Sequence, residues 1–204
     1  MDYKHLNGQG LEPIRRRPGM YFGAADADRS AQARLLEAVV RGVAQNTPPP
    51  RETRILLWRE AAVTVAYDGR SLPIEPFAPR AEDVPHPSFY WSFMDLYVWT
   101  AEFEPLLYRA ILNALSERLV VSTMHDGHRY RVVFSKGMLV TLLGRADCND
   151  PLGDTWFTFR LDPTVITGEV LTLADIQGIA ERIEQADGVR IRFEDRTAED
   201  ADWY

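Results

Sequence analysis

The chain has 204 residues, 46% of them hydrophobic, and a formal net charge of −7 at pH 7. This length and composition predict a single globular domain over residues 1–204. The acidic charge argues against direct nucleic-acid binding, because proteins hold phosphates with clustered lysines and arginines. The sequence has no run of about 20 apolar residues that would span a membrane, and its single cysteine, Cys148, cannot form an intrachain disulfide. We therefore expect a cytoplasmic protein without membrane contact.

The first twenty residues predict a loose arm followed by a sharp bend. Residues 1–10 are mostly polar and are expected to form a flexible arm. Pro18 restricts its φ angle and Gly19 accepts backbone angles that other residues avoid, so a tight turn is predicted here. We expect this turn to deliver Met20 and the aromatic pair after it into an apolar interior.

A helix and two strands are predicted next. Ser30 is a candidate N-cap for a helix that runs to Asn46 with apolar residues at helical spacing. Arg54 to Arg59 and Ala62 to Tyr67 are rich in β-branched and aliphatic residues and predict two strands joined by a tight turn. The proline-rich segment from Pro73 to Pro87 is expected to form no regular element.

The second half of the chain predicts a helix, a series of strands and a last helix. Apolar residues between Phe103 and Leu115 recur on one helical face. Asp126-Gly127 is a type I′ hairpin signal, and Thr172 with Asp175 resembles a capping box that opens the last helix. Strands are expected at Leu119 to Met124, Arg129 to Phe134, Met138 to Leu143, Thr155 to Leu161 and Val189 to Phe193, before an acidic tail at 195–204.

This succession of elements predicts the α/β class. Helix, two strands, helix, several hairpin-linked strands, helix and strand describe a two-layer sandwich, in which a mixed and largely antiparallel sheet carries helices on one face. Periodicity alone goes no further than this architecture.

Four segments contain known motifs in the order in which one family has them. Arg15 to Gly23 has the sequence RRRPGMYFG, Ala66 to Pro73 has AYDGRSLP, Ile111 to Ser116 has ILNALS, and Asp126 to Phe134 follows as a hairpin. These segments resemble the N-terminal ATPase domain of DNA gyrase B and topoisomerase IV, a member of the GHKL superfamily. The resemblance implies a Bergerat fold with a nucleotide pocket between sheet and helices, in a chain that ends where the next domain of the family would start.

The resemblance aligns Glu37 and Arg41 with two functional positions on the first pocket helix. In the family a Glu activates the hydrolytic water there, and an Asn one turn later holds magnesium. Arg41 has no lone pair to offer a metal, so no metal site is expected. Three interpretations stay open: an i, i+4 ion pair between the two residues, an Arg41 that contacts an anionic ligand directly, or a Glu37 that still works as a general base.

The adenine end of the implied pocket is altered as well. Tyr67 stands where the family has the Asp that accepts a hydrogen bond from the adenine amino group. A phenol ring would more easily fill that slot than accept the hydrogen bond. Asp68, Arg70 and Thr155 match family positions, the last of them a Thr that assists adenine recognition. From the residues alone, Asp68 is expected to form a turn, Arg70 a structural ion pair, and Thr155 an ordinary strand position.

The glycine-rich phosphate loop of the family has no counterpart in the sequence. Its place falls at Glu102 to Tyr108, EFEPLLY, and no glycine occurs between Gly69 and Gly127. Because glycines let several N–H groups converge on phosphates, we expect no tight ATP binding and no cofactor. The preceding stretch, Ser88 to Trp99, is rich in aromatic residues that could fill the vacated pocket, form a partner-binding or self-association patch, or stack on bases.

Together these features predict a non-catalytic gyrase-B-like module that stands alone and acts by protein interaction or regulation. A protein partner is expected, and a homodimer is left open. The first alternative is a sensor that holds a nucleotide or another anion through Arg41, Arg70 and Thr155 without hydrolysing it. The second is an active ATP-hydrolysing domain.

Overall fold

The computed structural model of the chain describes residues 11–21, 30–46, 48–69, 71–78, 85–94, 107–147, 152–167 and 170–203. The helices are α1 (Glu12–Arg16), α2 (Ala31–Ala44), α3 (Ser88–Met94), α4 (Leu107–Leu115) and α5 (Leu173–Asp187), with 3₁₀ turns η3 (Pro18–Met20) and η4 (Arg59–Ala61). The strands are β1 (Glu52–Trp58), β2 (Val63–Tyr67), β3 (Pro76–Phe77), β4 (His86–Pro87), β5 (Ser116–His125), β6 (His128–Ser135), β7 (Met138–Arg145), β8 (Thr155–Leu161) and β9 (Arg190–Arg196).

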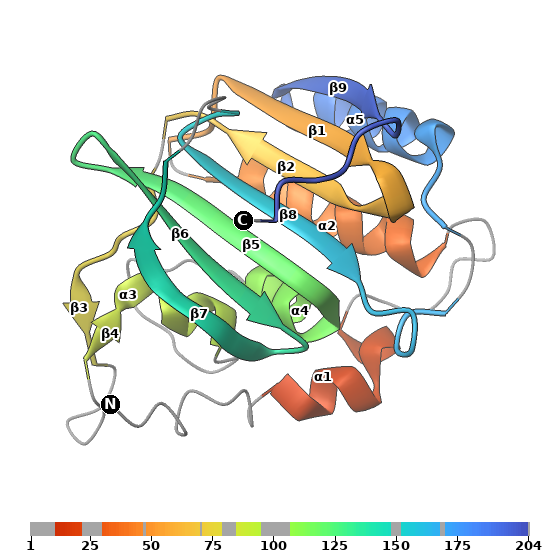
Figure 1. Cartoon of the computed structure of the whole chain (residues 1–204). Helices are drawn as coiled ribbons and strands as arrows, with labels where there is room; N and C mark the ends of the chain where they lie inside the picture. Colours follow the sequence, from red (N-terminus) through yellow and green to blue (C-terminus); the bar gives the residue numbers. More distant parts are fainter. Residues whose placement is uncertain are drawn as a thin grey trace.

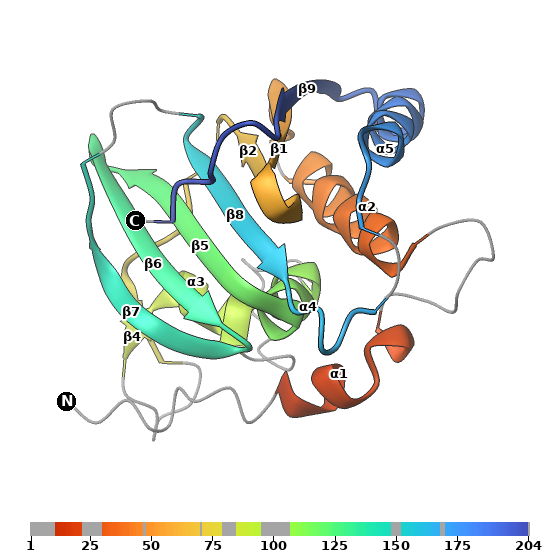
Figure 2. The same cartoon turned by 45° about the vertical axis from the view of Figure 1, so that its right-hand side comes forward.

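A seven-stranded sheet in the order β7-β6-β5-β8-β2-β1-β9 forms the body of the protein (Figure 1). Its neighbouring strands are antiparallel, except that β1 and β9 run parallel. Figure 2 shows α2, α4 and α5 on one side of this sheet and the C-terminal segment on the other. The predicted two-layer sandwich with a mixed, largely antiparallel sheet is confirmed. Within the described residues, none of the helices has the length and apolar character needed to cross a bilayer.

Local signals in the sequence correctly mark the starts of two helices and one hairpin turn. The Ser30 side chain accepts a hydrogen bond from the Ala33 N–H at 3.1 Å and begins α2. Thr172 and Asp175 form the expected capping box of α5. The β5–β6 turn has positive φ at both central residues, 47° and 72°, as a type I′ turn requires.

Helix α3 was not predicted. All seven of its residues, Ser88–Met94, are buried. A helix that is apolar on every side shows no amphipathic period, and the prolines before it favoured a loop. The aromatic side chains of α3 therefore pack into the core between the helices and the sheet.

The bend after α1 is confirmed, but the expected burial of Met20 is wrong. Residues 18–20 form a 3₁₀ turn, yet the Met20 side chain is 72% exposed. The apolar anchors of this segment are instead Leu11 and Ile14, which are 1% and 0% exposed. Tyr21, directly after the turn, is half-buried and packs against the core.

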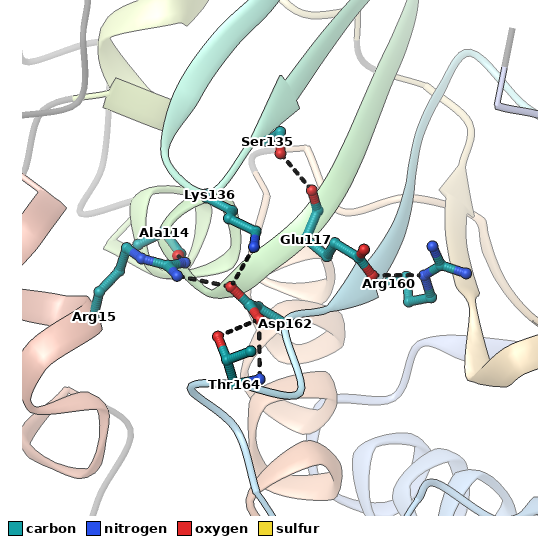
Figure 3. A network of polar contacts seen from close by, with 8 residues as sticks. All are labelled: Arg15, Ala114, Glu117, Ser135, Lys136, Arg160, Asp162 and Thr164. Carbon is teal, nitrogen blue, oxygen red and sulfur yellow. Dashed lines mark hydrogen bonds and ion pairs between the residues drawn. The ribbon is translucent and has the colours of Figure 1, made fainter.

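A buried carboxylate fixes α1 to the rest of the domain (Figure 3). Arg15 donates one hydrogen bond to Asp162 Oδ2 at 2.7 Å and another to the Ala114 carbonyl oxygen at 2.6 Å. Thr164 donates to Asp162 Oδ1 through its hydroxyl and its backbone N–H, and Lys136 Nζ lies 3.5 Å from Oδ2. Burial alone would raise the pKa of Asp162, but these donors and the Lys136 charge hold it well below its usual range.

The acidic C-terminal segment crosses the outer face of the sheet (Figure 1). Ala201 is buried, Arg131 Nη2 contacts Asp202 Oδ2 at 2.8 Å, and the Trp203 ring lies beneath the guanidinium of Arg118 at 5.6 Å. The segment that was predicted as an acidic tail packs, up to residue 203, over Leu56 and Trp58. The predicted arm at residues 1–10 lies outside the described part of the chain.

Candidate functional site

The positions that the resemblance assigns to adenine lie together on the inner face of the sheet. Tyr67 ends β2, is 2% exposed, and forms side-chain hydrogen bonds with Thr155 of β8 and with Asn46, just after α2. Burial raises the pKa of Tyr67 to about 12, although the nearby Arg109 charge opposes this shift. The phenol is therefore neutral at any physiological pH.

Arg109, in α4, inserts a charged side chain into the same space. It is 4% exposed, and its guanidinium carbon lies 5.7 Å, 5.7 Å and 5.9 Å from the ring centroids of Phe93, Tyr108 and Phe157. Its Nε donates to the Tyr108 hydroxyl at 3.2 Å. No carboxylate in the described ranges forms an ion pair with it, so the charge is stabilised by hydroxyl groups and ring faces.

Tyr108, in α4, packs its ring directly against α2. Its ring lies so near Gly42 that a Cβ at this glycine would be 2.4 Å from two of the ring atoms. A glycine in a helix interior is unfavourable by about 1 kcal/mol relative to alanine, and here it permits the close approach of the ring. Tyr67, Tyr108 and Arg109 together occupy the region between β2, β8 and α2, which we call the filled slot.

Glu37 is held by two arginines on a different side of α2. Arg41 Nη2 donates to its Oε1 at 3.1 Å, and Arg182 Nη2 of α5 donates to its Oε2 at 2.9 Å. Arg41 also lies 3.7 Å from Asp187. The i, i+4 ion pair is thus confirmed and extends across to α5, so that both carboxylate oxygens already accept a hydrogen bond from a guanidinium.

The two sets of residues diverge because of helix geometry. Glu37 and Arg41 are one turn apart and point toward α5, whereas Gly42 lies about 100° further around the helix and faces the filled slot. The structure therefore brings Tyr67 together with Thr155, and Glu37 together with Arg41, as separate groups.

The remaining predicted positions have structural partners. Asp68 Oδ1 accepts hydrogen bonds from the backbone N–H groups of Arg51 and Glu52, so this carboxylate joins the end of β2 to the start of β1. Thr155 Oγ1 lies 3.0 Å from Thr123 Oγ1 and is fully buried. Arg70 lies outside the described residues.

Most of the segment that stands in place of the phosphate loop is not among the described residues. Residues 101–106, with Glu102 and Glu104, lie outside the described part of the chain, and only its end reaches α4. Four of the six aromatic residues between Phe89 and Trp99 are buried, with exposed fractions between 0% and 9%, and Tyr97 and Trp99 are not described. Stacked rings such as Phe93 and Phe134, 5.6 Å apart, make these four part of the core.

Sequence reasoning missed Asn46, Tyr108 and Arg109. Arg109 sits in a helix whose apolar face was recognised, and a single charge in such a helix carries no sign of an inward direction. A glycine in the middle of an otherwise regular α2 was the signal for a close neighbour such as Tyr108. In the described ranges, no cluster of three His, Cys, Asp or Glu side chains could hold a metal ion.

Comparison with known proteins gives consistent matches in sequence. The B-type subunit of DNA topoisomerase 4 from Caulobacter vibrioides is 29% identical over 140 residues, which cover 63% of this chain and 19% of that protein. DNA gyrase B of Mycobacterium tuberculosis is 28% identical over 188 residues, covering 87% of this chain and 26% of that protein. The chain thus spans about a fifth to a quarter of the length of these relatives. No family model matches it.

The fold agrees with these matches. The structure of the 43K ATPase domain of Thermus thermophilus gyrase B, in complex with an aminocoumarin, superposes with a TM-score of 0.75. It covers 93% of this chain and 49% of that one, at 21% identity. At this level of identity the similarity shows the fold.

Proposed function

We propose that this chain, which has the fold of the gyrase B type of GHKL ATPase domain, has kept that scaffold without its catalytic activity. We propose that it acts by binding another protein. The observation that carries this proposal is the filled slot. Tyr67 stands where the resemblance implies an adenine contact, and the guanidinium of Arg109 lies beside it with hydrogen bonds to the Tyr67 and Tyr108 hydroxyl groups. A nucleotide would have to displace a buried ring and a buried cation before it could bind.

The environment of Glu37 supports the same proposal. A general base needs a free lone pair directed at a water molecule, and both Glu37 oxygens accept hydrogen bonds from arginines. Arg41 and Arg182 are 41% and 40% exposed, so each pair adds modestly to stability. Each arginine therefore engages one of the two carboxylate oxygens that a general base would direct at water.

The sensor alternative required Arg41, Arg70 and Thr155 to face one ligand. Arg41 is directed toward Glu37 and Asp187, and Thr155 toward Thr123 and Tyr67. This arrangement favours the interaction role over the sensor, and the partner can be another protein or a second copy of the chain.

Thermal unfolding with and without millimolar ATP, ADP and Mg²⁺ tests the proposal. A ligand at 100 times its Kd would add about 2.7 kcal/mol of stability, and we expect no shift. Phosphate release is measured in parallel for the wild type, Glu37→Ala and the control Glu181→Ala, an exposed position on α5. Release that disappears only in Glu37→Ala would establish an enzyme and contradict the proposal.

A further inference from the structure

A hollow of about 450 Å³ opens on the surface beside α1 and η3. The residues of α1 that line it are exposed, whereas Ile14 of the same helix is buried. Its lining combines apolar and basic groups: Glu12, Pro13, Arg16, Arg17, Met20 and Tyr21.

Met20 contributes an exposed apolar side chain to the lining of this hollow. At 72% exposure it is the most exposed of the large apolar side chains described. Methionine adapts its shape to different partners and recurs at protein-binding surfaces. An exposed apolar group next to a concavity indicates a binding surface more strongly than an isolated one does.

The charge of the hollow is opposite to that of the whole chain. Arg16 pairs with Glu12 at 3.1 Å, and both side chains are more than half exposed, so this pair is weak. Arg17 is exposed and forms no ion pair with any residue that the structure describes. An exposed cation of this kind therefore borders an apolar hollow in a protein of net charge −7.

The hollow is also held in one shape. Leu11 and Ile14 bury the opposite side of α1, and Arg15 binds Asp162 and the Ala114 carbonyl oxygen from the same short helix. A surface that does not need to be ordered on binding retains more of its interaction energy.

We propose that this hollow docks an acidic segment of a partner protein. An apolar side chain of that segment packs against Met20 and Tyr21, and flanking carboxylates pair with Arg17 and Arg16. This inference deepens the proposed function, on which it rests, by naming the surface and the charge of the partner. Two neighbouring arginines are too few to hold a nucleic-acid backbone, which needs a longer basic track.

Fluorescence anisotropy with the full chain tests this proposal. The probe is a labelled ten-residue peptide in which Asp and Glu flank a central Leu and Phe, compared with its Asn and Gln counterpart and with a 20-nucleotide single-stranded DNA. We expect the acidic peptide alone to bind. Arg17→Glu should weaken its binding by at least about tenfold, and Met20→Ala by a smaller factor.

Two substitutions away from the hollow serve as controls. Arg51→Glu makes the same charge change at an exposed position before β1, and Met138→Ala removes a methionine that is 41% exposed on β7. Both should bind the peptide as the wild type does. Circular dichroism of all four variants checks that they are folded.

Four results would overturn the proposal: no binding of the acidic peptide at millimolar concentration, equal loss in Arg17→Glu and Arg51→Glu, equal binding of the neutral peptide, or binding of the DNA through Arg17. A dimer in sedimentation that Arg17→Glu dissociates would assign the hollow to a second copy and also overturn it. A failure here leaves the proposed function intact if ATP still has no effect, whereas ATP binding would remove that function whatever the peptide does.

Discussion

Two buried charges in this molecule are stabilised in opposite ways. Asp162 is completely buried and is paired with Arg15 and Lys136. Arg109 is buried almost as deeply, but hydroxyl groups and aromatic rings surround it without a carboxylate from the described residues. The first charge joins segments that resemble the gyrase B type, and the second lies in the slot where the chain departs from that pattern. The buried charge in the scaffold is therefore stabilised by ion pairs, whereas the buried charge in the slot is stabilised by hydroxyl groups and aromatic rings.

The largest effect on stability is expected at Asp162, which is paired with Arg15 and Lys136. Asp162→Asn removes the counter-charge of Arg15, whose side chain is 17% exposed, and should lower the free energy of unfolding by about 3 to 5 kcal/mol. Urea denaturation measures this value. The control Asp200→Asn breaks an ion pair with Arg59 in which both side chains are more than half exposed, and it should change stability by less than about 1 kcal/mol. Equal losses would mean that burial of the pair has no special importance.

The pH dependence sharpens the same contrast. Because the pKa of Asp162 is lowered in the folded state, its contribution is present above its unfolded pKa, about 4, and is lost as the pH falls below that value. The difference in unfolding free energy between the wild type and Asp162→Asn should be constant from pH 5 to 7 and shrink below pH 4. A difference that grows with acidity would show that the sign of the shift is wrong.

The next effect tests how tightly the slot is filled. Gly42→Ala gains about 1 kcal/mol of helix propensity but forces the Tyr108 ring to move, so we expect a net loss of about 1 to 2 kcal/mol. Gly178→Ala, in α5, meets only the flexible end of Arg182 and should be neutral or stabilising. In a Tyr108→Leu background, Gly42→Ala should lose much of its effect. If the two alanine variants behave alike in thermal or urea unfolding, Tyr108 does not press on α2.

The smallest effect on stability is expected at Arg109, which forms no ion pair with the described residues. Arg109→Met replaces a buried cation by an apolar side chain of similar length, and stability should change by no more than about 1 kcal/mol in either direction. Arg109→Ala leaves a cavity among the rings and should lower stability by about 2 kcal/mol or more. A large loss in Arg109→Met would place the Arg109 charge in the same class as Asp162 and remove the contrast between the two regions.

The elements of the fold were largely predictable because their signals are local. The Ser30 cap, the Thr172 capping box and the Asp126-Gly127 turn each act within a few residues. Helix α3 escaped prediction because burial on all sides removes the amphipathic period on which such predictions depend.

The site was predictable only where partners are close in sequence. The Glu37 pair with Arg41 follows from i, i+4 spacing, whereas the Arg182 partner comes from a helix 145 residues away in the chain. Tyr67 was expected to occupy the slot, and its contacts with Thr155 and Arg109 depend on how three elements pack. Long-range packing of this kind leaves no periodic trace in a single sequence.

The central claim is that the side chains of the protein itself occupy the slot. The direct test is a crystal structure after soaking with a non-hydrolysable ATP analogue and Mg²⁺. The account predicts a Tyr108 ring still against Gly42, with no density for the analogue between Tyr67 and Thr155. Clear density for a base at that place, with Tyr108 displaced from α2, would contradict it.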